Sequence, residues 1–349
     1  MVNSVTPSWF FNSQLSVPLI DVRSPSEFAQ GHISGAVNIP LFSDTERAEI
    51  GTLYKNAGKE AALFLGLDRV GPNMSGFVKK LNAISRGKTR EVVVYCWRGG
   101  MRSASMAWLF STAGFQVHLI EGGYKNLRTY IRAESGKNTP MIVLGGMTGS
   151  GKTEILHELK KRGEQIIDLE DIAHNKGSVF GYLGQLPQPT NEQFENNLFA
   201  EWIKLDHTKR IWIEDESRSV GAVGLPAPFF DHMKKQPLIL LNVTIEKRVE
   251  RLVNEYAGFD KNLLLEALAK ISQAMGGQGV TEAKKDIQDG DFAPAIKLVL
   301  EYYDKTYRKA LEKFKSRKIT EFDTHTGDAK ENAEQILKLI SGNNELNYG

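Results

Sequence analysis

Cysteine is nearly absent from this chain of 349 residues, which contains only Cys96. A single thiol excludes a disulfide within the chain. Because no charged and apolar leader follows Met1, we expect a reducing, cytoplasmic environment. Long apolar runs are missing as well, which argues against a membrane protein. The 44 basic and 42 acidic side chains nearly cancel, so any binding of nucleic acid has to depend on local basic patches.

Short apolar, β-rich segments alternate with helical patterns along most of the chain. The expected strands are residues 18–22, 91–95, 117–120, 141–144, 165–169, 210–213 and 237–243. Such alternation predicts α/β domains with parallel sheets and crossover helices. A polar stretch with Gly and Pro at 132–140 indicates a domain boundary. The predicted parts are a first domain at 1–134, a second α/β core at 140–259, a mostly helical extension of that core at 260–340 and a flexible tail at 341–349.

Cys96 lies between an expected strand and an expected helix, in the segment CWRGGMRS at 96–103. The N-terminus of a helix favours an anion through its free N–H groups and its dipole. Arg98 and Arg102 add positive charge, and Gly99 and Gly100 allow successive amides to form an anion-binding nest. The pattern therefore favours a nucleophilic thiolate over an inert, buried cysteine.

The segment GGMTGSGKT at 145–153 is a complete Walker A motif, with an expected strand before it and a helix after it. The motif predicts that backbone N–H groups cradle a diphosphate, that Lys152 reaches the outer oxygens and that the Thr153 hydroxyl can bind Mg²⁺. The predicted diphosphate-binding residues are Gly146, Gly149, Ser150, Gly151, Lys152 and Thr153.

Acidic residues follow two further strands. Glu214 and Asp215 end the strand at 210–213 as a Walker B element does, and Asp168 follows the strand before it. These three carboxylates are candidate ligands for a metal or a substrate, although a solvated acidic turn has the same appearance. The sequence assigns no metal ligand firmly.

Three segments around the Cys96 loop give the first 132 residues a family resemblance. The segments LIDVRSPSEF (19–28), GHISGAVNIP (31–40) and EGGY (121–124) resemble the signatures of rhodanese domains. We expect Asp21 and Arg23 to pair and brace the loop, and His32 to serve as a turn residue. Five residues separate Cys96 from Arg102, one more than in most sulfurtransferase rhodaneses and as many as in related phosphatases. This length predicts a pocket for a phosphate-bearing chalcogen donor or for a phosphoester.

The whole chain resembles the tRNA 2-selenouridine synthases. The resemblance rests on the two motifs above and on DLEDIA (168–173), GS (177–178), FEN (194–196), EDESR (214–218) and LEYYD (300–304). The tripeptide Asn175-Lys176-Gly177 stands where the family usually has His-Arg-Gly, and the nearby histidine, His174, lies one position earlier. The resemblance implies a tRNA partner with 2-thiouridine in its anticodon loop, with selenophosphate and geranyl diphosphate as substrates. It implies no tightly bound cofactor, apart from candidate Mg²⁺, and allows a selenophosphate-producing enzyme as a further partner.

On that basis Cys96 is expected to carry selenium as a selenosulfide, and the Walker A loop to hold the diphosphate of geranyl diphosphate. The candidate contacts for tRNA or phosphate are His174, Arg218, Lys247, Arg248 and Arg251. The basic, aromatic helix at 301–318 fits either RNA stacking or an ordinary core face. The alternative function is a small-molecule P-loop kinase or NTPase with a rhodanese-like or phosphatase-like module.

Overall fold

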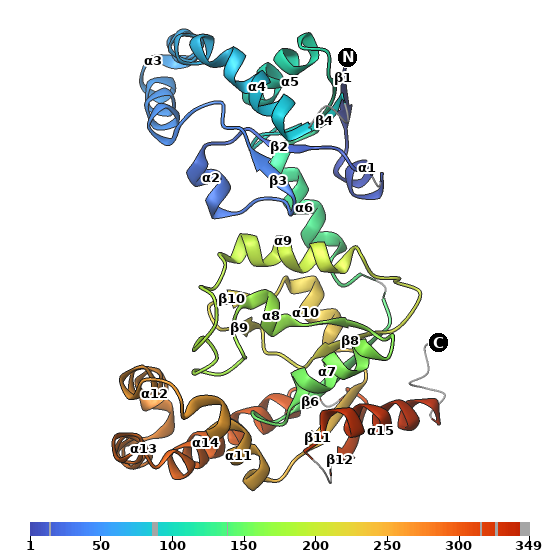
Figure 1. Ribbon diagram of the computed structural model, residues 1–349, viewed down its shortest axis with the longest axis vertical. Helices are drawn as coiled ribbons and strands as arrows, with labels where there is room; N and C mark the ends of the chain where they lie inside the picture. The colour runs from blue at the N-terminus through green and yellow to red at the C-terminus, as the bar shows by residue number, and fades with distance from the viewer. Residues whose placement is uncertain (14, 86–89, 138, 315, 325–326, 343–349) are drawn as a thin grey trace. The chain divides into compact units, whose positions relative to one another are not determined.

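The computed structural model describes residues 1–342 except 14, 86–89, 138, 315 and 325–326. The chain divides into two compact units, whose elements are labelled in Figure 1. Unit 1 comprises Met1–Glu134 and Glu195–Ile203, and unit 2 comprises the remainder of the chain.

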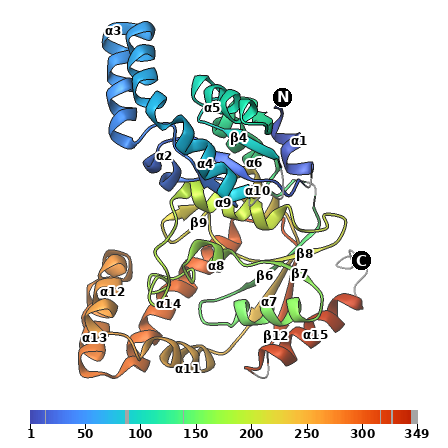
Figure 2. The ribbon, with the colours of Figure 1, turned by 45° about the horizontal axis from the view of Figure 1, so that its top comes forward.

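Unit 1 is built on a five-stranded parallel sheet with the order β1-β5-β4-β2-β3. The strands are β1 (Val2–Val5), β2 (Leu19–Asp21), β3 (Ala36–Asn38), β4 (Glu91–Tyr95) and β5 (Gln116–Ile120). The helices are α1 (Pro7–Asn12), α2 (Pro25–Gln30), α3 (Asp44–Val70), α4 (Met74–Ser85), α5 (Met101–Thr112) and α6 (Gly123–Glu134), with the short 3-10 helix η1 (Gly71–Asn73). Helix α3 bends where Gly58 leaves helical geometry, as Figure 2 shows.

Unit 2 has its own five-stranded parallel sheet, with the order β12-β11-β6-β8-β7. The strands are β6 (Met141–Gly146), β7 (Gln165–Ile167), β8 (Ile211–Glu214), β11 (Leu238–Asn242) and β12 (Ile319–Asp323), with a separate antiparallel pair of β9 (Ser219–Val220) and β10 (Val223–Gly224). The helices are α7 (Lys152–Lys161), α8 (Leu169–Ala173), α10 (Ala227–Met233), α11 (Ile245–Tyr256), α12 (Lys261–Met275), α13 (Gly277–Asp289), α14 (Phe292–Glu312) and α15 (Ala329–Ser341).

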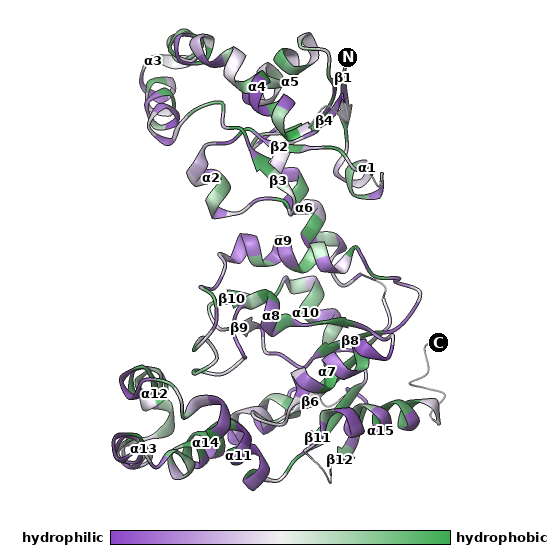
Figure 3. Cartoon of the chain, in the orientation of Figure 1, coloured by the Kyte–Doolittle hydropathy of each residue, from purple (hydrophilic) through white to green (hydrophobic). Residues whose placement is uncertain are grey.

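The two parallel sheets confirm the predicted α/β class. Every residue of β6 is buried, as are the last four residues of β4, because helices cover parallel sheets on both faces. Figure 3 shows the strands mainly in hydrophobic colours and many helices with a hydrophilic side. None of the helices formed by the described residues is both long enough and apolar enough to cross a membrane.

The C-terminal region at 260–340 is mostly helical, as predicted, but it also contains a strand. Residues 319–323 form strand β12, which pairs with β11 along its whole length, and α15 packs on the sheet through Ala333, Ile336 and Ile340. The mostly helical part is therefore α11–α14, which has its own core. The strand escaped prediction because ITEFD is short and has three polar residues, so it lacks the continuous apolar run of the buried strands, as an edge strand can. Most of the predicted tail, residues 343–349, lies outside the described residues.

Helix α9 (Asn191–Trp202) also departs from the predicted domain limits, which assigned it to the second core. Its residues from Glu195 onward group with unit 1. Arg128 on α6 forms an ion pair with Glu195 and donates a hydrogen bond to Asn196 at 3.0 Å, and Arg132 binds Glu195 at 2.7 Å. The FEN segment thus serves to hold α9 on α6 through buried, charge-assisted hydrogen bonds.

A buried ion pair beside the sheet confirms the predicted pairing of Asp21 and Arg23. Both residues are 0% exposed, and the guanidinium binds both carboxylate oxygens of Asp21. Arg23 also donates to the Gly31 carbonyl at 2.6 Å and lies 3.8 Å from the centre of the Tyr124 ring. The pair thereby ties β2, the turn after α2 and the start of α6 together.

Replacing Arg23 by methionine should lower the free energy of unfolding by about 3–5 kcal/mol, because it leaves the Asp21 charge buried without a partner. The matched control is Arg69→Met, since Arg69 pairs with Glu49 in an exposed position, and its loss should cost about 1 kcal/mol or less. Urea denaturation of both variants measures the difference. Equal losses would contradict the bracing role.

Candidate functional site

The Walker A segment forms a turn between the end of β6 and the start of α7. Gly151 has left-handed geometry at the N-cap of α7, where free N–H groups favour a phosphate. The Lys152 ammonium donates a hydrogen bond to the Gly146 carbonyl at 3.1 Å. Ser150 is 5% exposed, and its hydroxyl has no hydrogen-bond partner among the described residues. The loop therefore has the shape of the predicted diphosphate cradle.

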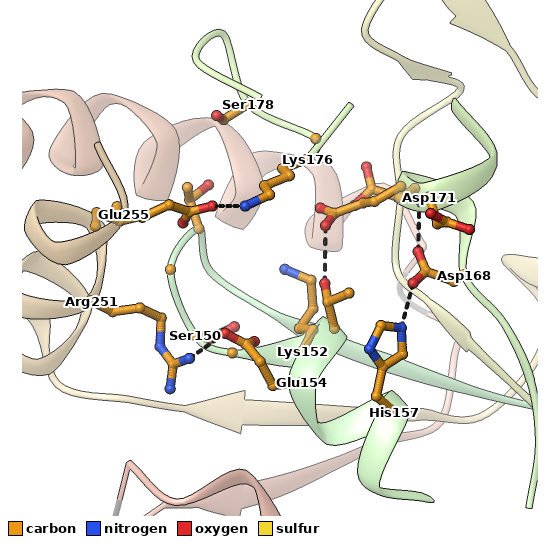
Figure 4. A pocket seen from close by; sticks show the side chains of 18 of the residues that line it. Ser150, Lys152, Glu154, His157, Asp168, Asp171, Lys176, Ser178, Arg251 and Glu255 are labelled. Carbon is orange, nitrogen blue, oxygen red and sulfur yellow. Dashed lines mark hydrogen bonds and ion pairs between the residues drawn. The ribbon is translucent and has the colours of Figure 1, made fainter. Parts of the chain in front are cut away.

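A cavity of about 350 Å³ lies over this loop. Figure 4 shows Lys152 between the Lys176–Glu255 ion pair on one side and the His157–Asp168 pair on the other. The structure brings the predicted residues Gly149, Ser150, Gly151, Lys152, Thr153, Asp168 and Arg251 together around the cavity. Asp168 also caps α8 by accepting the Asp171 N–H at 2.8 Å.

Carboxyl groups gather around the Thr153 hydroxyl. Its oxygen lies 2.7 Å from Glu214 Oε1 and 3.0 Å from Glu170 Oε2. A hydroxyl has a single proton to donate, so one of these carboxyl groups has to be protonated and donate in return when no cation is bound. Burial and the neighbouring Glu216 raise the pKa of Glu170 to about 8, and burial with the charge of Glu170 raises the pKa of Glu214 well above its usual range.

This concentration of carboxyl groups is suited to a cation, or to a ligand that carries one, in place of the proton. No set of three or more His, Cys, Asp or Glu side chains within the described ranges has the arrangement of a metal site. Mg²⁺ at phosphate sites usually uses only one or two carboxylates and completes its shell with phosphate and water oxygens. The Thr153 hydroxyl and the Glu214 and Glu170 carboxyl groups fit that limited role.

Asp215 differs from its predicted role as a metal or substrate ligand. Three groups bind its carboxylate: the Lys234 ammonium at 2.8 Å, the Arg317 guanidinium at 2.7 Å and the Tyr307 hydroxyl at 2.9 Å. Burial opposes the charge, but Lys234 and Arg317 outweigh it and lower the pKa of Asp215. Tyr307 also accepts the Gly146 N–H at 3.2 Å. Asp215 therefore braces the loop and does not line the cavity above it.

Arg248 requires a similar correction, because it is 3% exposed and cannot meet an RNA surface. Its guanidinium binds both oxygens of Asp304, at 2.8 and 2.7 Å, and lies 3.3 Å from the Thr148 carbonyl. A bidentate pair of this kind fixes the position of α11 against α14 and of the Walker A loop against both. Arg248 thus acts as a support of the loop.

The other predicted contacts lie at different places in unit 2. Arg251 lines the cavity and pairs with Glu154 at 2.5 Å, and Lys247 lines a second cavity beside the same loop. His174 ends α8 in left-handed geometry, and its ring lies 2.9 Å from the Pro187 carbonyl. Arg218 is exposed and lies over the Phe230 ring at 5.5 Å. Neither His174 nor Arg218 lines the cavity.

The aromatic side chains of the expected 301–318 helix face the protein interior. The Tyr303 hydroxyl accepts the Val179 N–H at 2.7 Å, Tyr307 contacts the Walker A loop, and Phe314 packs edge-on against Phe230. The sequence left open whether this segment stacks on RNA or forms an ordinary core face, and these three residues form a core face. Lys305, Arg308, Lys309 and Lys313 are exposed and stay available to an RNA.

The predicted ligands leave out several residues of the cavity. Glu170 and Glu216 each lie two residues beyond a predicted acid, and Lys176 and Glu255 form an ion pair at the rim. Gly177, with a φ of +69°, lies directly over the carboxylates. The acid-rich runs that end β7 and β8 were the available signal, because parallel strands bring their carboxyl ends to one edge of the sheet.

Cys96 lies at the end of β4 in unit 1, 2% exposed. Its sulfur is 3.1 Å from the Ser103 hydroxyl, which donates to the Gly100 carbonyl at 3.2 Å. Gly99, with a φ of +65°, and Gly100, the N-cap of α5, form the predicted turn. Arg102 binds Glu27 at 2.5 and 3.2 Å, and this partner lowers the pKa of Glu27 despite its burial. Arg98 is exposed.

These two sites define a class of protein in which one chain joins a rhodanese-like sheet, with a cysteine at a helix N-terminus, to a P-loop α/β sheet. A model of the rhodanese-like domain matches residues 10–129, and a model described as the tRNA 2-selenouridine synthase AAA domain matches residues 139–263. The chain belongs to the tRNA 2-selenouridine synthase family.

Curated relatives support this assignment over most of the chain. A tRNA 2-selenouridine synthase of Shewanella sediminis is 35% identical, and the match covers 86% of this chain and 90% of that relative. One of Shewanella frigidimarina is 34% identical over 88% of this chain and 92% of the relative. One of Bdellovibrio bacteriovorus is 42% identical, over 70% of this chain and 65% of the relative.

Replacing Gly177 by alanine should weaken the binding of inorganic diphosphate several-fold, because the new Cβ would stand 2.9 Å from Glu170 Oε1 and 3.1 Å from Glu216 Oε1. Gly163→Ala is the matched control, since Gly163 also has positive φ but has no atom within 4 Å of the added carbon. Both variants should lose about 1 kcal/mol of stability or somewhat more from backbone strain. Titration calorimetry with diphosphate separates the loss of affinity from the loss of stability. Equal affinities of the two variants for diphosphate would contradict close packing of Gly177 against the carboxylates.

Proposed function

We propose that this chain is a transferase that converts 2-thiouridine of a tRNA to 2-selenouridine. The proposal depends on one observation: the chain contains both a Walker A cradle and a cysteine loop of phosphatase length. The same chain aligns over 86% of its length with a tRNA 2-selenouridine synthase. The substrate tRNA supports a cytoplasmic location, and a selenophosphate-producing enzyme is the proposed source of the selenium donor.

The Walker A cradle is assigned to geranyl diphosphate. The thiocarbonyl sulfur of the uridine attacks C1 of the geranyl group, the C1–O bond breaks and diphosphate leaves, while the uridine loses its N3 proton. Lys152 and the backbone N–H groups of the loop stabilise the charge that develops on the departing diphosphate. The apolar side chains of Leu252 and Tyr256 line the cavity over the loop, which supports their contact with the hydrocarbon chain.

Thr153 and Glu214, with Glu170 beside them, would hold Mg²⁺ together with the diphosphate oxygens. A bound Mg²⁺ supplies positive charge to the leaving group. The chain's own contribution is to keep these carboxyl oxygens at 2.7 and 3.0 Å from the Thr153 hydroxyl, at the wall of the cavity. ATP hydrolysis is not needed for this reaction.

The Cys96 loop is assigned to selenophosphate, whose selenium is at the oxidation level of selenide. A selenosulfide on Cys96 would form only with a two-electron oxidant. Attack of the thiolate on phosphorus needs none: the P–Se bond breaks, selenide leaves, and water later removes the phosphoryl group from sulfur. Selenide then displaces geranyl thiolate from C2 of the uridine. The Cys96–Arg102 spacing and the Ser103 hydroxyl, 3.1 Å from the sulfur, support this sequence.

A small-molecule P-loop kinase or NTPase is the second candidate. The observation that favours it is the breadth of the Walker A cavity, since such a loop usually binds a nucleotide. It predicts turnover of a nucleotide by the Lys152 site without any RNA. Nucleoside analysis of thiolated tRNA after incubation with geranyl diphosphate and selenophosphate, added separately and together, distinguishes the two functions.

Replacing Lys152 by alanine should lower geranyl transfer by about a hundredfold or more, because it removes the cation that faces the leaving diphosphate. Lys161→Ala on the exposed side of the same helix is the control and should transfer at the wild-type rate. Mass spectrometry of nucleosides from thiolated tRNA gives the rates. Intact transfer by the Lys152 variant would refute the assignment of the cradle.

Replacing Cys96 by alanine should abolish formation of 2-selenouridine while S-geranylated uridine still accumulates, because only the selenium step uses the thiol. Ser105→Ala, on the exposed face of α5, controls for changes in that helix. The same nucleoside analysis, with both donors present, measures the two products. Selenouridine formation that persists without the thiol would remove Cys96 from the mechanism.

A further inference from the structure

A group of cations and aromatic rings lies on unit 2 and does not line the cavity over the Walker A loop. The Arg218 guanidinium lies 5.5 Å from the centre of the Phe230 ring. The Lys234 ammonium lies 5.4 Å from the same ring and 5.7 Å from the ring of Phe314. The two rings pack edge to face with their centres 6.4 Å apart. These four residues, which come from the turn before β9, from α10 and from the end of α14, are called the cation–aromatic cluster below.

The backbone holds Arg218 beside α10. Strands β9 and β10 form a tight hairpin, and directly after it the Leu225 N–H donates to the Arg218 carbonyl at 3.0 Å. Helix α10 begins two residues later, and its first turn carries Phe230. Arg218 is exposed and forms no ion pair with any residue that the structure describes. Its planar group therefore rests on a ring and can bind an anion or a second planar group with little rotamer freedom left to lose.

Lys234 has a supporting role in the cluster, because Asp215 neutralises its charge at 2.8 Å and only 10% of its side chain is exposed. Lys234, Phe314 and Ser217 line a cavity of about 60 Å³. Small-molecule sites begin at about 300 Å³, so this cavity is too small to enclose a nucleobase. A base would have to be recognised by stacking on the outer surface of the cluster, where Arg218 lies.

The end of α14 adds positive charge next to Phe314. Residues 305–314 contain a single acid, Glu312, and four cations that are all exposed: Lys305, Arg308, Lys309 and Lys313. None of these cations forms an ion pair within the described part of the chain, whereas the exposed Lys338 of α15 pairs with Glu334. Like charges four residues apart on a helix repel each other. An anionic partner along this face would offset that repulsion, so the charge pattern favours a polyanion.

We propose that the cation–aromatic cluster, together with Lys309 and Lys313, binds a single-stranded segment of the substrate tRNA. Arg218 and Phe230 stack against an unpaired base, and the two lysines contact phosphates of the same segment. An acidic peptide would use the charges but not the planar surface, so the cluster favours RNA. The inference rests on the proposed function, which makes a tRNA the substrate, and adds the surface that binds it.

The test measures fluorescence anisotropy of the full chain with two labelled RNAs, an anticodon stem–loop and a blunt duplex of equal length. Arg218→Ala should bind the stem–loop about tenfold more weakly, the loss expected for one stacked base, and the duplex nearly as the wild type does. Arg218→Lys keeps the charge without the planar guanidinium, so it should stay nearly as weak for the stem–loop as the alanine variant.

The double variant Lys309→Ala/Lys313→Ala should weaken binding of both RNAs and reduce the slope of log affinity against log salt by about 1. The matched control is Lys330→Ala/Lys338→Ala, which removes the same charge from exposed positions of α15 and should bind as the wild type does. All these variants should bind inorganic diphosphate with wild-type affinity by titration calorimetry, because none of the changed residues lines the cavity over the Walker A loop.

The proposal is overturned if Arg218→Ala binds the stem–loop as the wild type does, or if it loses affinity for stem–loop and duplex equally. Full recovery in Arg218→Lys would contradict stacking, and equal losses in the α14 and α15 double variants would contradict a local surface. Loss of diphosphate binding in Arg218→Ala would assign Arg218 to the cradle instead. A wild type that binds the stem–loop through this surface but yields neither geranylated nor selenated uridine would support the proposal and defeat the proposed function.

Discussion

The burial of several carboxyl groups next to the Walker A loop is the constraint on which unit 2 depends. Glu214 and Glu216 are buried, Glu170 lines the cavity beside them, and the charge of Lys152 acts on both Glu170 and Glu216. Buried carboxylates without enough positive charge take up protons or attract a cation. These carboxyl groups therefore favour a phosphate ligand that arrives with its cation, because the cation can take the place of their protons.

The Walker A loop beside these carboxyl groups is held in position by contacts from several elements. Tyr307 links the Gly146 amide to Asp215, and Asp215 is neutralised in turn by Lys234 and Arg317. On the other side the Arg248–Asp304 pair connects α11 and α14 to the loop. Charge-assisted bonds in buried surroundings keep a cradle in shape before its ligand binds, which is the condition for stabilising charge without reorganisation.

The cysteine loop of unit 1 is likewise held in position by charge-assisted hydrogen bonds. Arg23 and Asp21 brace β2, and Arg102 at the start of α5 is held by Glu27 on α2. Arg23 and Arg102 thus each fix the position of a backbone segment near the thiol. Arg98, in contrast, is an exposed cation of the loop. In both units, therefore, some charged residues hold the Walker A loop or the cysteine loop in position, and others are placed where they can contact a substrate.

The sequence by itself determined the α/β class, the Walker A cradle, the cysteine turn and the Asp21–Arg23 pair, because these follow from local patterns a few residues long. Only the tertiary structure decided that Glu214 faces Thr153 while Asp215 turns away, since successive residues at the end of a strand point to opposite sides. It also decided the burial of Arg248, the strand at 319–323 and the attachment of α9 to unit 1. Each of these results from a contact between residues far apart in the chain, and such contacts leave no periodic signal in the sequence.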